Sequence, residues 1–436
     1  MRPLILVTGA TGYIASRLIP RLLNAEYRVR ALARDPLRLE SRNWFRHVEV
    51  VSGDVMNSST LAPALAGVQV AYYLIHNMSS GRGYTERELE GARNFAKAAE
   101  QAGIEHIIYL GGLADPEQHI APHMRSRIET GVVLREGKVP VTEFRAGVIA
   151  GSGSISFEMI RFTTELFPIV PGPMWLNNKS QPIAVQNVID YLLAALVNPN
   201  GRGQVFEIGG PEVTYYKDLM LKYAHARGLK RSMILLPYVP LWLMAFGVGL
   251  ITPVPRSIAH ALIGGLSADS MVKHSEVLQV FSEVKLISFD EAARQSIDSL
   301  SPAHVERVWD DGGQPAKTLK HEGFFIHHRQ TQIDAPAKKV FQAISSFINK
   351  PNLQVEVNDV DEKIIVYMKD QYAGKKWIEW RLNQTLSVTC LTQTVFFAPR
   401  GTAGFLYWYL LSPFQSLSFL SFIHKIKSEC AARSEA

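Results

Sequence analysis

Short apolar runs alternate with helix-like segments along the first two hundred residues of the chain. Leu4–Val7 is an apolar run with the length of a strand buried on both faces, and apolar residues at helical spacing follow at Leu18, Ile19 and Leu22. Further strands are predicted at residues 27–33, 47–51, 70–75, 107–110, 141–149 and 204–208, and helices at 86–101, 181–196 and 215–226. Parallel strands need long crossover connections, so this alternation predicts an α/β fold with a doubly wound parallel sheet.

The pattern changes beyond residue 300. Residues 301–322 are polar and contain Asp310-Asp311-Gly312-Gly313, which is typical of a linker. Strands are then predicted at 324–333, 355–368, 376–382 and 387–397, a helix from residue 335, and a long aromatic-rich helix at 402–427 that Pro413 interrupts. We therefore predict an α/β domain over residues 1–300, a linker over 301–322 and a smaller α+β domain over 323–436.

A glycine turn lies between the first predicted strand and the first predicted helix. Such an arrangement sets backbone N–H groups and a helix N-terminus against a pyrophosphate. Gly9 permits the tight turn, and Gly12 lets the ligand approach the backbone. An ordinary strand–turn–helix is the alternative, but the motif stands in the context that a dinucleotide site requires. The predicted contacts of this turn with a dinucleotide are Thr8, Gly9, Thr11, Gly12, Tyr13 and Ile14.

The ends of the other predicted strands supply the remaining cofactor contacts, because ligands of such sheets bind outside the carboxyl ends of the strands. Arg34 follows the second strand, where an arginine favours the 2′-phosphate of NADP and an acidic residue favours NAD. Asp35 comes directly after it, and Asp54 can face the adenine amino group. The full set at these ends is Arg34, Asp54, Val55, Leu74, Ile75, His76 and Gly111. We predict NADP(H) in preference to NAD(H).

The composition of the chain limits the kinds of binding partner and the cellular compartment that we expect. The 436 residues carry a net charge of +6 without a dense Lys/Arg run, which suits a phosphate-bearing ligand or an anionic membrane surface and does not call for nucleic acid. Cys390 and Cys430 form neither a metal-ligand spacing nor a disulfide framework. We therefore expect no metal site and a reducing, cytoplasmic location, and the first residues do not resemble a signal peptide.

Residues 236–266 form the most apolar stretch of the chain, and Pro253 and Pro255 interrupt it. The uninterrupted part is shorter than the roughly twenty residues that a membrane span needs. We expect a buried helix or the lining of a pocket, which favours an apolar small molecule as substrate. Peripheral, interfacial contact with a membrane is the alternative.

The motifs in this order resemble the atypical, extended short-chain dehydrogenases/reductases. The resemblance covers about the first 300 residues and rests on TGATGYIA at 8–15, RALARDP at 30–36, GDV at 53–55 and RAGVIAGSGSISFE at 145–158. It implies a Rossmann domain that binds a nicotinamide cofactor. More narrowly, His76-Asn77-Met78, the GSGS loop and the second domain are similar to an uncharacterised bacterial subgroup. The second domain of that subgroup resembles the helix-grip, lipid-transfer type of fold.

The catalytic positions depart from the family. Its members use a Tyr-x-x-x-Lys pair on the helix after the fifth strand and a serine at the end of that strand. Gly111-Gly112 stands at the serine position here, and the helix reads His123-Met124-Arg125-Ser126-Arg127. No tyrosine with a lysine four residues later occurs near it. The resemblance therefore predicts the cofactor without its usual proton relay.

Two hypotheses follow from this departure. In the first, His123 and Arg127 replace the pair at the same i, i+4 spacing, with His123 as acid and Arg127 holding the ribose or a substrate anion. His76 is then a second proton donor, and the protein is an oxidoreductase that acts on an apolar carbonyl or enone. In the second, the protein is a non-catalytic NADP-binding regulator or assembly factor. A membrane-surface lipid-binding protein is a third possibility.

Three further residues are candidates for substrate contacts. Arg145 ends the sixth predicted strand, where we expect it to pair with a carboxylate or to line the pocket. Ser152 and Ser154 lie in the small, hydroxyl-rich loop that follows and have the chemistry to bind a polar head group. A plain turn explains the two serines nearly as well.

Overall fold

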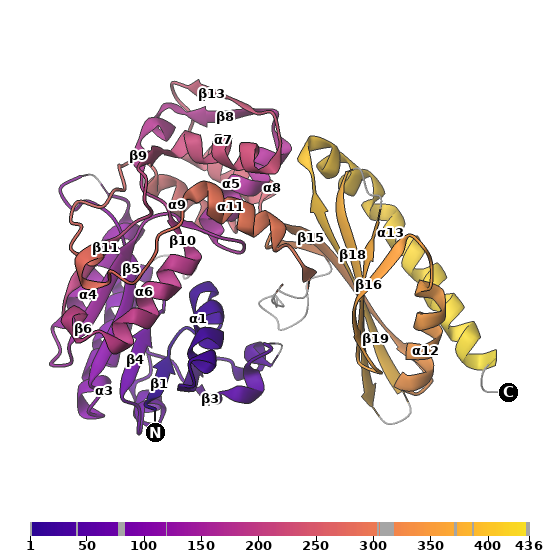
Figure 1. Cartoon of the computed structure of the whole chain (residues 1–436), viewed down its shortest axis with the longest axis horizontal. Helices are drawn as coiled ribbons and strands as arrows, with labels where there is room; N and C mark the ends of the chain where they lie inside the picture. The colour runs from indigo at the N-terminus through magenta and orange to yellow at the C-terminus, as the bar shows by residue number, and fades with distance from the viewer. Residues whose placement is uncertain are drawn as a thin grey trace. The chain divides into compact units, whose positions relative to one another are not determined.

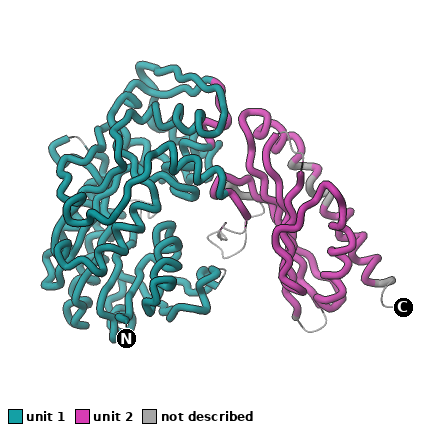
Figure 2. Tube along the Cα trace, in the orientation of Figure 1, with its two compact units in different colours: residues 1–161, 169–299 teal, residues 162–168, 300–436 magenta. Residues whose placement is uncertain are grey.

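A computed structural model describes residues 2–40, 42–76, 83–118, 120–302, 305, 318–369, 373–385 and 388–432. The chain divides into two compact units (Figure 2). Unit 1 comprises Met1–Arg161 and Ile169–Ser299, and unit 2 comprises Phe162–Pro168 and Leu300–Ala436. Helix α5 (Ile155–Leu166) therefore begins in unit 1, and its last residues belong to unit 2.

The core of unit 1 is a seven-stranded sheet in the order β11-β6-β5-β4-β1-β2-β3 (Figure 1). Every pair of neighbouring strands in it is parallel. The strands are β1 (Leu4–Val7), β2 (Arg28–Ala33), β3 (Glu49–Ser52), β4 (Val70–Tyr73), β5 (His106–Gly112), β6 (Val141–Ala146) and β11 (Val205–Ile208). The predicted doubly wound parallel sheet is confirmed.

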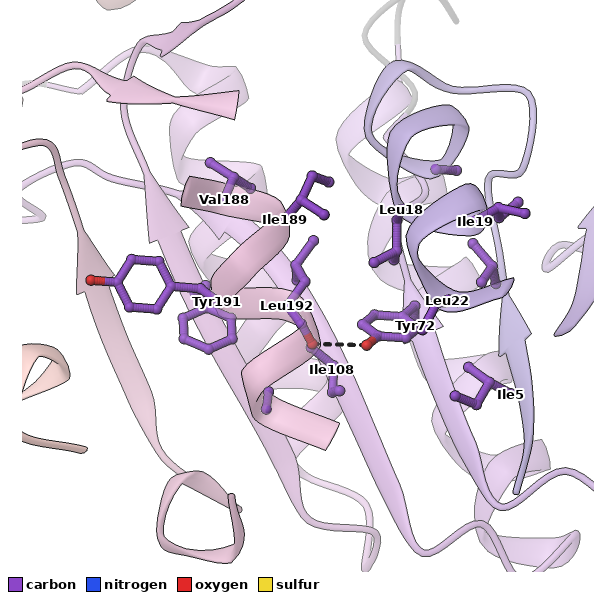
Figure 3. Close-up of a cluster of buried hydrophobic side chains, with 14 of the residues drawn as sticks. Ile5, Leu18, Ile19, Leu22, Tyr72, Ile108, Val188, Ile189, Tyr191 and Leu192 are labelled. Atoms are coloured by element: carbon purple, nitrogen blue, oxygen red, sulfur yellow. Dashed lines mark hydrogen bonds between the residues drawn. The ribbon is translucent and has the colours of Figure 1, made fainter. Parts of the chain in front are cut away.

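Helices cover both faces of this sheet, as its strands require because they are apolar on both sides. On one face, α1 (Tyr13–Asn24) and α6 (Val185–Val197) pack with the strands in one apolar cluster (Figure 3). Within it, the hydroxyl of Tyr72 on β4 donates to the carbonyl of Leu192 on α6 at 2.8 Å. On the other face, α2 (Leu61–Leu65), α3 (Tyr84–Gln101) and α4 (Pro122–Arg135) form a second cluster.

The chain after β6 builds a further part of unit 1. Three two-stranded pairs form there: β7 (Ile149–Ala150) with β10 (Ile183–Ala184), β8 (Ile169–Pro173) with β13 (Ser232–Leu236), and β9 (Lys179–Ser180) with β12 (Thr214–Tyr215). The helices of this part are α5, α7 (Tyr216–Arg227), α8 (Leu241–Ile251), α9 (Arg256–Gly265), α10 (Val277–Val280) and α11 (Phe289–Asp298). Phe157, Tyr223 and Phe289 lie at the centre of its main apolar cluster.

The apolar stretch 236–266 differs from the expected buried helix. It forms α8 and α9, and Ala245 is the one residue of α8 that is fully buried. Trp242, Leu243, Phe246 and Leu250 of α8 are exposed. The expectation of a buried helix was wrong for α8, because this segment has apolar residues on every side and only one side meets the rest of unit 1. None of the described helices has the length and hydropathy to cross a membrane.

Unit 2 contains a six-stranded antiparallel sheet in the order β14-β15-β19-β18-β17-β16. Its strands are β14 (Thr318–His321), β15 (Phe324–Ile333), β16 (Leu353–Asp359), β17 (Lys363–Met368), β18 (Gly374–Thr385) and β19 (Val388–Pro399). Helices α12 (Ala337–Ile348) and α13 (Gly401–Ala432) pack on the sheet in one apolar cluster. The expected second, smaller α+β domain with an antiparallel sheet is present.

Three details of unit 2 differ from the sequence-based expectation. The single strand expected at 355–368 is two strands, β16 and β17, joined by a turn in which Asp361 has a φ of +61°. Residues 318–321, expected in the linker, form β14. Helix α13 continues through Pro413, because Trp408 before the proline and Phe419 after it are both buried in apolar clusters.

Candidate functional site

The order of the parallel strands places a crevice between β1 and β4. From β1 the chain builds β2 and β3 on one side and then crosses over to β4 on the other. Ligands of open α/β sheets bind outside the carboxyl ends of the strands at such a switch point. The glycine turn follows β1, and His76 follows β4, so both lie at this crevice.

The backbone of the glycine turn lies against the end of β4. Gly9 has a φ of +62°, and a Cβ at this position would lie 2.8 Å from the carbonyl oxygen of Leu74. Thr8 is buried, and its Oγ1 accepts from the Leu74 N–H at 3.0 Å. Thr11 and Gly12 are exposed, and Gly12 precedes the first residue of α1. The first turn of α1 has no acidic residue, so the partial positive charge of the helix N-terminus faces an open turn.

Two arginines lie near this turn on the side of β2. Arg34 is exposed at the end of β2. Arg42 follows the short helix η1 (Pro36–Leu39) and donates from Nη2 to the carbonyl oxygen of Thr11 at 3.2 Å. Asp35, the residue that would favour NAD, caps η1 by accepting from the N–H of Leu37 at 3.2 Å, and its other oxygen lies 3.8 Å from Nε of Arg38. The carboxylate of Asp35 is therefore engaged within its own loop.

The other residues on this side of the crevice are held by contacts within unit 1. Arg30 on β2 pairs with Glu49 at 2.8 Å and donates to the carbonyls of Ala64 and Ala66, so its role is structural. Asp54 accepts from the N–H of Met56 at 3.0 Å. Val55 is buried against Gly91 of α3, where a Cβ would lie 2.8 Å from Cγ2 of the valine. Ile75 is partly buried against the same cluster as α3.

A buried polar cluster lies at the ends of β4 and β5, and Glu88 is at its centre. This carboxylate comes from α3 and is 6% exposed. One oxygen lies 2.6 Å from Nδ1 of His76, and the other accepts from the hydroxyl of Ser126 on α4. Arg127, the next residue of α4, donates from Nε to Nε2 of His76 at 3.2 Å. A carboxylate, an imidazole and a guanidinium thus form a continuous chain.

This chain of hydrogen bonds assigns the protonation of His76. Nε2 accepts from Arg127, so the ring proton is on Nδ1 and is donated to Glu88. Burial lowers the pKa of His76, and the adjacent Arg127 guanidinium lowers it further, while Glu88 opposes both effects. The imidazole is neutral at pH 7, and in this arrangement both of its nitrogens are engaged.

His123 lies on the same helix, one turn before Arg127. It is 3% exposed, and burial, with added repulsion from Arg127 and His76, lowers its pKa to about 4. A Cβ on Gly265 of α9 would lie 2.9 Å from Cε1 of the imidazole, so the ring is covered by that helix. Its Nδ1 has no hydrogen-bond partner among the described residues. A neutral, covered imidazole is a poor proton donor at neutral pH, which speaks against the predicted acid role of His123.

The two glycines at the end of β5 make room for neighbouring side chains. A Cβ on Gly112 would lie 2.8 Å from Cε of Met124 and 2.9 Å from Cδ of Arg127. A Cβ on Gly111 would lie 3.2 Å from Oε1 of Glu143. The space that a serine side chain occupies in the family is thus taken here by α4 and β6. Arg127 is also anchored at its backbone, where its carbonyl accepts from the hydroxyl of Tyr109 at 2.9 Å.

The predicted substrate contacts are engaged in other interactions. Nε of Arg145 donates to the buried carboxylate of Glu143 at 2.7 Å, and Arg135 pairs with the same carboxylate, which fits the expectation that Arg145 pairs with an acid. The hydroxyl of Ser154 donates to the carbonyl of Ile149 at 2.7 Å, as in a plain turn. The carbonyl oxygen of Ser152 accepts from Arg17 of α1 at 2.8 Å. That bond places the loop after β7 beside the glycine turn.

Sequence reasoning missed four polar residues of this region. They are Arg42, Glu88, Ser126 and Glu143. Glu88 had a usable signal, because it stands at helical spacing before Ala92, Phe95 and Ala99 on the face of α3 that is otherwise apolar. A carboxylate on such a face needs a buried partner, and His76 and Ser126 are those partners here.

Known proteins resemble this chain over unit 1. Residues 1–165 match the model of the NmrA-like family. A (4-alkanoyl-5-oxo-2,5-dihydrofuran-3-yl)methyl phosphate reductase of Streptomyces griseus is 31% identical over 216 residues, which cover 48% of this chain and 68% of the relative. Photosystem II assembly factor Ycf39 of Cyanophora paradoxa is 28% identical over 218 residues, covering 47% of this chain and 63% of the relative. The NADPH-dependent quinone oxidoreductase of Escherichia coli, solved with NADPH, has a TM-score of 0.55 at 16% identity, over 67% of this chain and 99% of that one.

The parallel sheet with a glycine turn at its switch point defines a Rossmann-type α/β protein. Within that class, the chain belongs to the atypical, extended short-chain dehydrogenases/reductases, and the NmrA-like match covers its residues 1–165. The resemblance of the first 300 residues to the atypical, extended short-chain dehydrogenases/reductases is confirmed. The matched regions span 63%, 31% and 40% of three relatives, namely Ycf39, a 3-beta-hydroxysteroid dehydrogenase and a cinnamoyl-CoA reductase.

Proposed function

We propose that unit 1 binds NADP(H) at the switch point and uses it to reduce an apolar carbonyl or enone. One observation carries the proposal: Gly9 at a φ of +62°, with no room for a Cβ, holds an open glycine turn and a helix N-terminus at the crevice. A pyrophosphate fits this turn, because exposed backbone at a helix N-terminus binds anions. The names of the furanone-type and quinone reductases among the similar proteins support the reaction class.

NADP(H) is preferred over NAD(H) in this proposal. Arg34 and Arg42 supply positive charge beside the turn, whereas Asp35 is engaged with Leu37 and Arg38. A 2′-phosphate is stabilised by such arginines, and a ribose hydroxyl gains nothing from them. The remaining cofactor contacts in the proposal are Thr8, Thr11, Gly12, Tyr13, Ile14, Asp54, Val55, Leu74, Ile75 and Gly111.

The chain's own residues define the proposed chemistry. Bound NADPH would supply the hydride. The Arg127 guanidinium stabilises the negative charge that develops on the carbonyl oxygen, and Glu88, acting through His76, holds this guanidinium in place. The imidazoles of His76 and His123 are neutral at pH 7 because burial lowers both pKa values, so we assign delivery of the proton to water.

Cofactor titration tests the first part of the proposal. The fluorescence of NADPH and NADH should rise saturably on binding, with tighter binding of NADPH. Arg34→Asp should shift the preference toward NADH by about tenfold, since one charge-assisted contact is worth about 1.5–3 kcal/mol. Arg28→Asp is the matched control, because Arg28 is at the opposite end of β2 from Arg34, where it pairs with Glu49. Failure of both nucleotides to bind would refute the proposal.

A panel of quinones and enones tests the reaction. NADPH oxidation should fall at least a hundredfold in Arg127→Met, as when a transition-state donor is removed. The affinity for NADPH and the melting temperature of this variant separate lost chemistry from lost folding. Full activity in Arg127→Met would remove this residue from the mechanism.

A non-catalytic NADP-binding regulator or assembly factor is the second candidate. The neutral, buried imidazole of His123 at the place of the usual proton relay favours it, and Ycf39 is by name an assembly factor. Tight NADPH binding without oxidation by any member of the panel would select this function. Both candidates are placed in the cytoplasm, where Cys390 and Cys430 remain free thiols. Peripheral membrane contact is a further property that we propose, and its surface is defined by α8 and β13.

A further inference from the structure

Helix α8 is apolar on all sides, yet only one side is covered. Leu241, Met244, Ala245 and Val248 face inward and pack with Val254, Ala259 and Ile263 in one cluster. Helices that are apolar all round are found in protein interiors or in membranes. The outward side of α8 therefore calls for a partner.

The outward side carries large aromatic and aliphatic residues at helical spacing. Trp242, Phe246 and Leu250 are 66%, 44% and 59% exposed and lie four residues apart. The preceding segment of the chain also exposes apolar residues, namely Ile234, Leu236 and Tyr238, the tyrosine at 81%. β13 pairs with β8, whose first residue Ile169 is 53% exposed. Soluble monomers seldom expose apolar residues in such a group without a binding function.

The Lys and Arg residues of the segment that carries this surface are not matched by acidic residues of the same segment. No Asp or Glu occurs between Asp218 and Asp269, while five Lys or Arg residues do. Lys230 and Arg256 are exposed at the two ends of the apolar segment. The guanidinium of Arg256 lies 4.3 Å from the centre of the Phe246 ring, so a cation and an aromatic residue share one place on the surface. Exposed aromatic residues with flanking cations are typical of helices that lie in a membrane interface.

We propose that α8 and residues 234–238 dock on an anionic lipid bilayer. The helix lies in the plane of the membrane, with Trp242, Phe246 and Leu250 inserted below the headgroups. Lys230 and Arg256 meet the lipid phosphates. A second copy of the chain fits less well, because a symmetric contact would bring two basic segments together with no acidic residue of the segment to offset them.

Vesicle co-sedimentation of the full chain tests the proposal. The protein should pellet with vesicles of phosphatidylcholine containing a third phosphatidylglycerol, and much less with phosphatidylcholine alone. Trp242→Ser/Phe246→Ser should lower the partition coefficient at least tenfold. Lys230→Gln/Arg256→Gln should lower it about fivefold for each charge removed, and 0.5 M salt should have a similar effect. Val197→Ser/Leu278→Ser is the matched control, because it removes two exposed apolar residues elsewhere in unit 1 and should leave binding unchanged.

Three outcomes would overturn the proposal. They are no binding to anionic vesicles, equal binding by the Trp242→Ser/Phe246→Ser variant, and a concentration-dependent dimer in buffer that this variant abolishes while vesicles leave the wild type in solution. The affinity of each variant for NADPH is measured in parallel. It should remain unchanged, so a failure of membrane docking is distinguishable from a failure of the cofactor proposal.

Discussion

The glycine turn and the Glu88 cluster lie at the same edge of the same sheet but are built by opposite means. The turn is made of backbone from one short segment, with Gly9 held against Leu74 by its positive φ. The cluster is made of side chains from three segments, with Glu88 on α3, His76 after β4 and Ser126-Arg127 on α4. The turn is open to solvent, and the cluster is buried. Removing a side chain from the cluster therefore leaves a buried charge unpaired, whereas a substitution in the turn changes the shape of the backbone there.

The largest effect is expected from Glu88→Ala. It leaves the buried guanidinium of Arg127 without the carboxylate that balances its charge across His76, and an uncompensated buried charge costs about 3–5 kcal/mol. Glu88→Gln keeps an acceptor oxygen for His76 and places an N–H donor toward the hydroxyl of Ser126, so it should cost less than half as much. Urea denaturation measures both, with Glu90→Ala on the exposed side of α3 as the control. A loss below 1 kcal/mol in the alanine variant would mean that the cluster is not a buried charge network.

A smaller effect is expected from Gly9→Ala. The new Cβ would meet the Leu74 carbonyl at 2.8 Å and shift the turn, so the affinity for NADPH should fall about a hundredfold, or about 2.7 kcal/mol. Gly67→Ala is the matched control, because Gly67 also has a positive φ, +72°, but nothing lies within 4 Å of its added Cβ. Equal affinities for NADPH in these two variants would show that cofactor binding does not depend on the close approach of Gly9 to the carbonyl of Leu74.

The third effect is on the pH dependence of stability. Burial lowers the pKa of His123 to about 4, from about 6.5 in an unfolded chain, so the unfolded state binds the proton more tightly. The stability from this group is present above pH 6.5 and is lost as the pH falls toward 4, by about 2 kcal/mol between pH 7 and 4.5. His123→Leu should flatten this part of the curve of unfolding free energy against pH. His260→Gln, at an exposed position of α9, should not.

The smallest effect on function is expected from Gly112→Ser, which restores the serine of the family. Its Cβ would crowd Met124 and Arg127, at 2.8 and 2.9 Å, and such overpacking costs about 1–3 kcal/mol. Turnover should not rise, since the tyrosine and lysine remain absent. Gly137→Ser, where the nearest atom would be 3.5 Å away, is the control for both stability and activity. A gain in turnover in Gly112→Ser would show that a serine at the end of β5 can still take part in catalysis, as it does in the family.

Much of unit 1 was predictable because its signals are local. Strand lengths, helical spacing and the glycine turn gave the parallel sheet, and the order of motifs gave the family. The α+β class of unit 2 was also predictable, although its boundaries were less so. The Asp361 turn and the continuity of α13 through Pro413 depend on contacts with distant residues.

The candidate site was predictable only in part. His76, His123 and Arg127 were singled out as candidates, and the structure joins His76 to Arg127, but the acid role expected for the two histidines does not suit their burial. The protonation state of each histidine depends on its burial and on the charge of a partner from another helix. Neither can be inferred from a single segment of the sequence. The exposure of α8 is a similar case, since its composition alone predicts burial.

The sequence by itself determined where the backbone turns and which segments are apolar, because these follow from the residues of each segment. Tertiary structure alone decided which side chains meet: it joined Glu88 to His76 and Arg127, engaged Asp35 and Arg30 in other interactions, and left the outer side of α8 uncovered. The physical reason is that pairing and desolvation depend on the distance between segments far apart in the chain. The pairing and protonation of the site's side chains therefore depend on those distances.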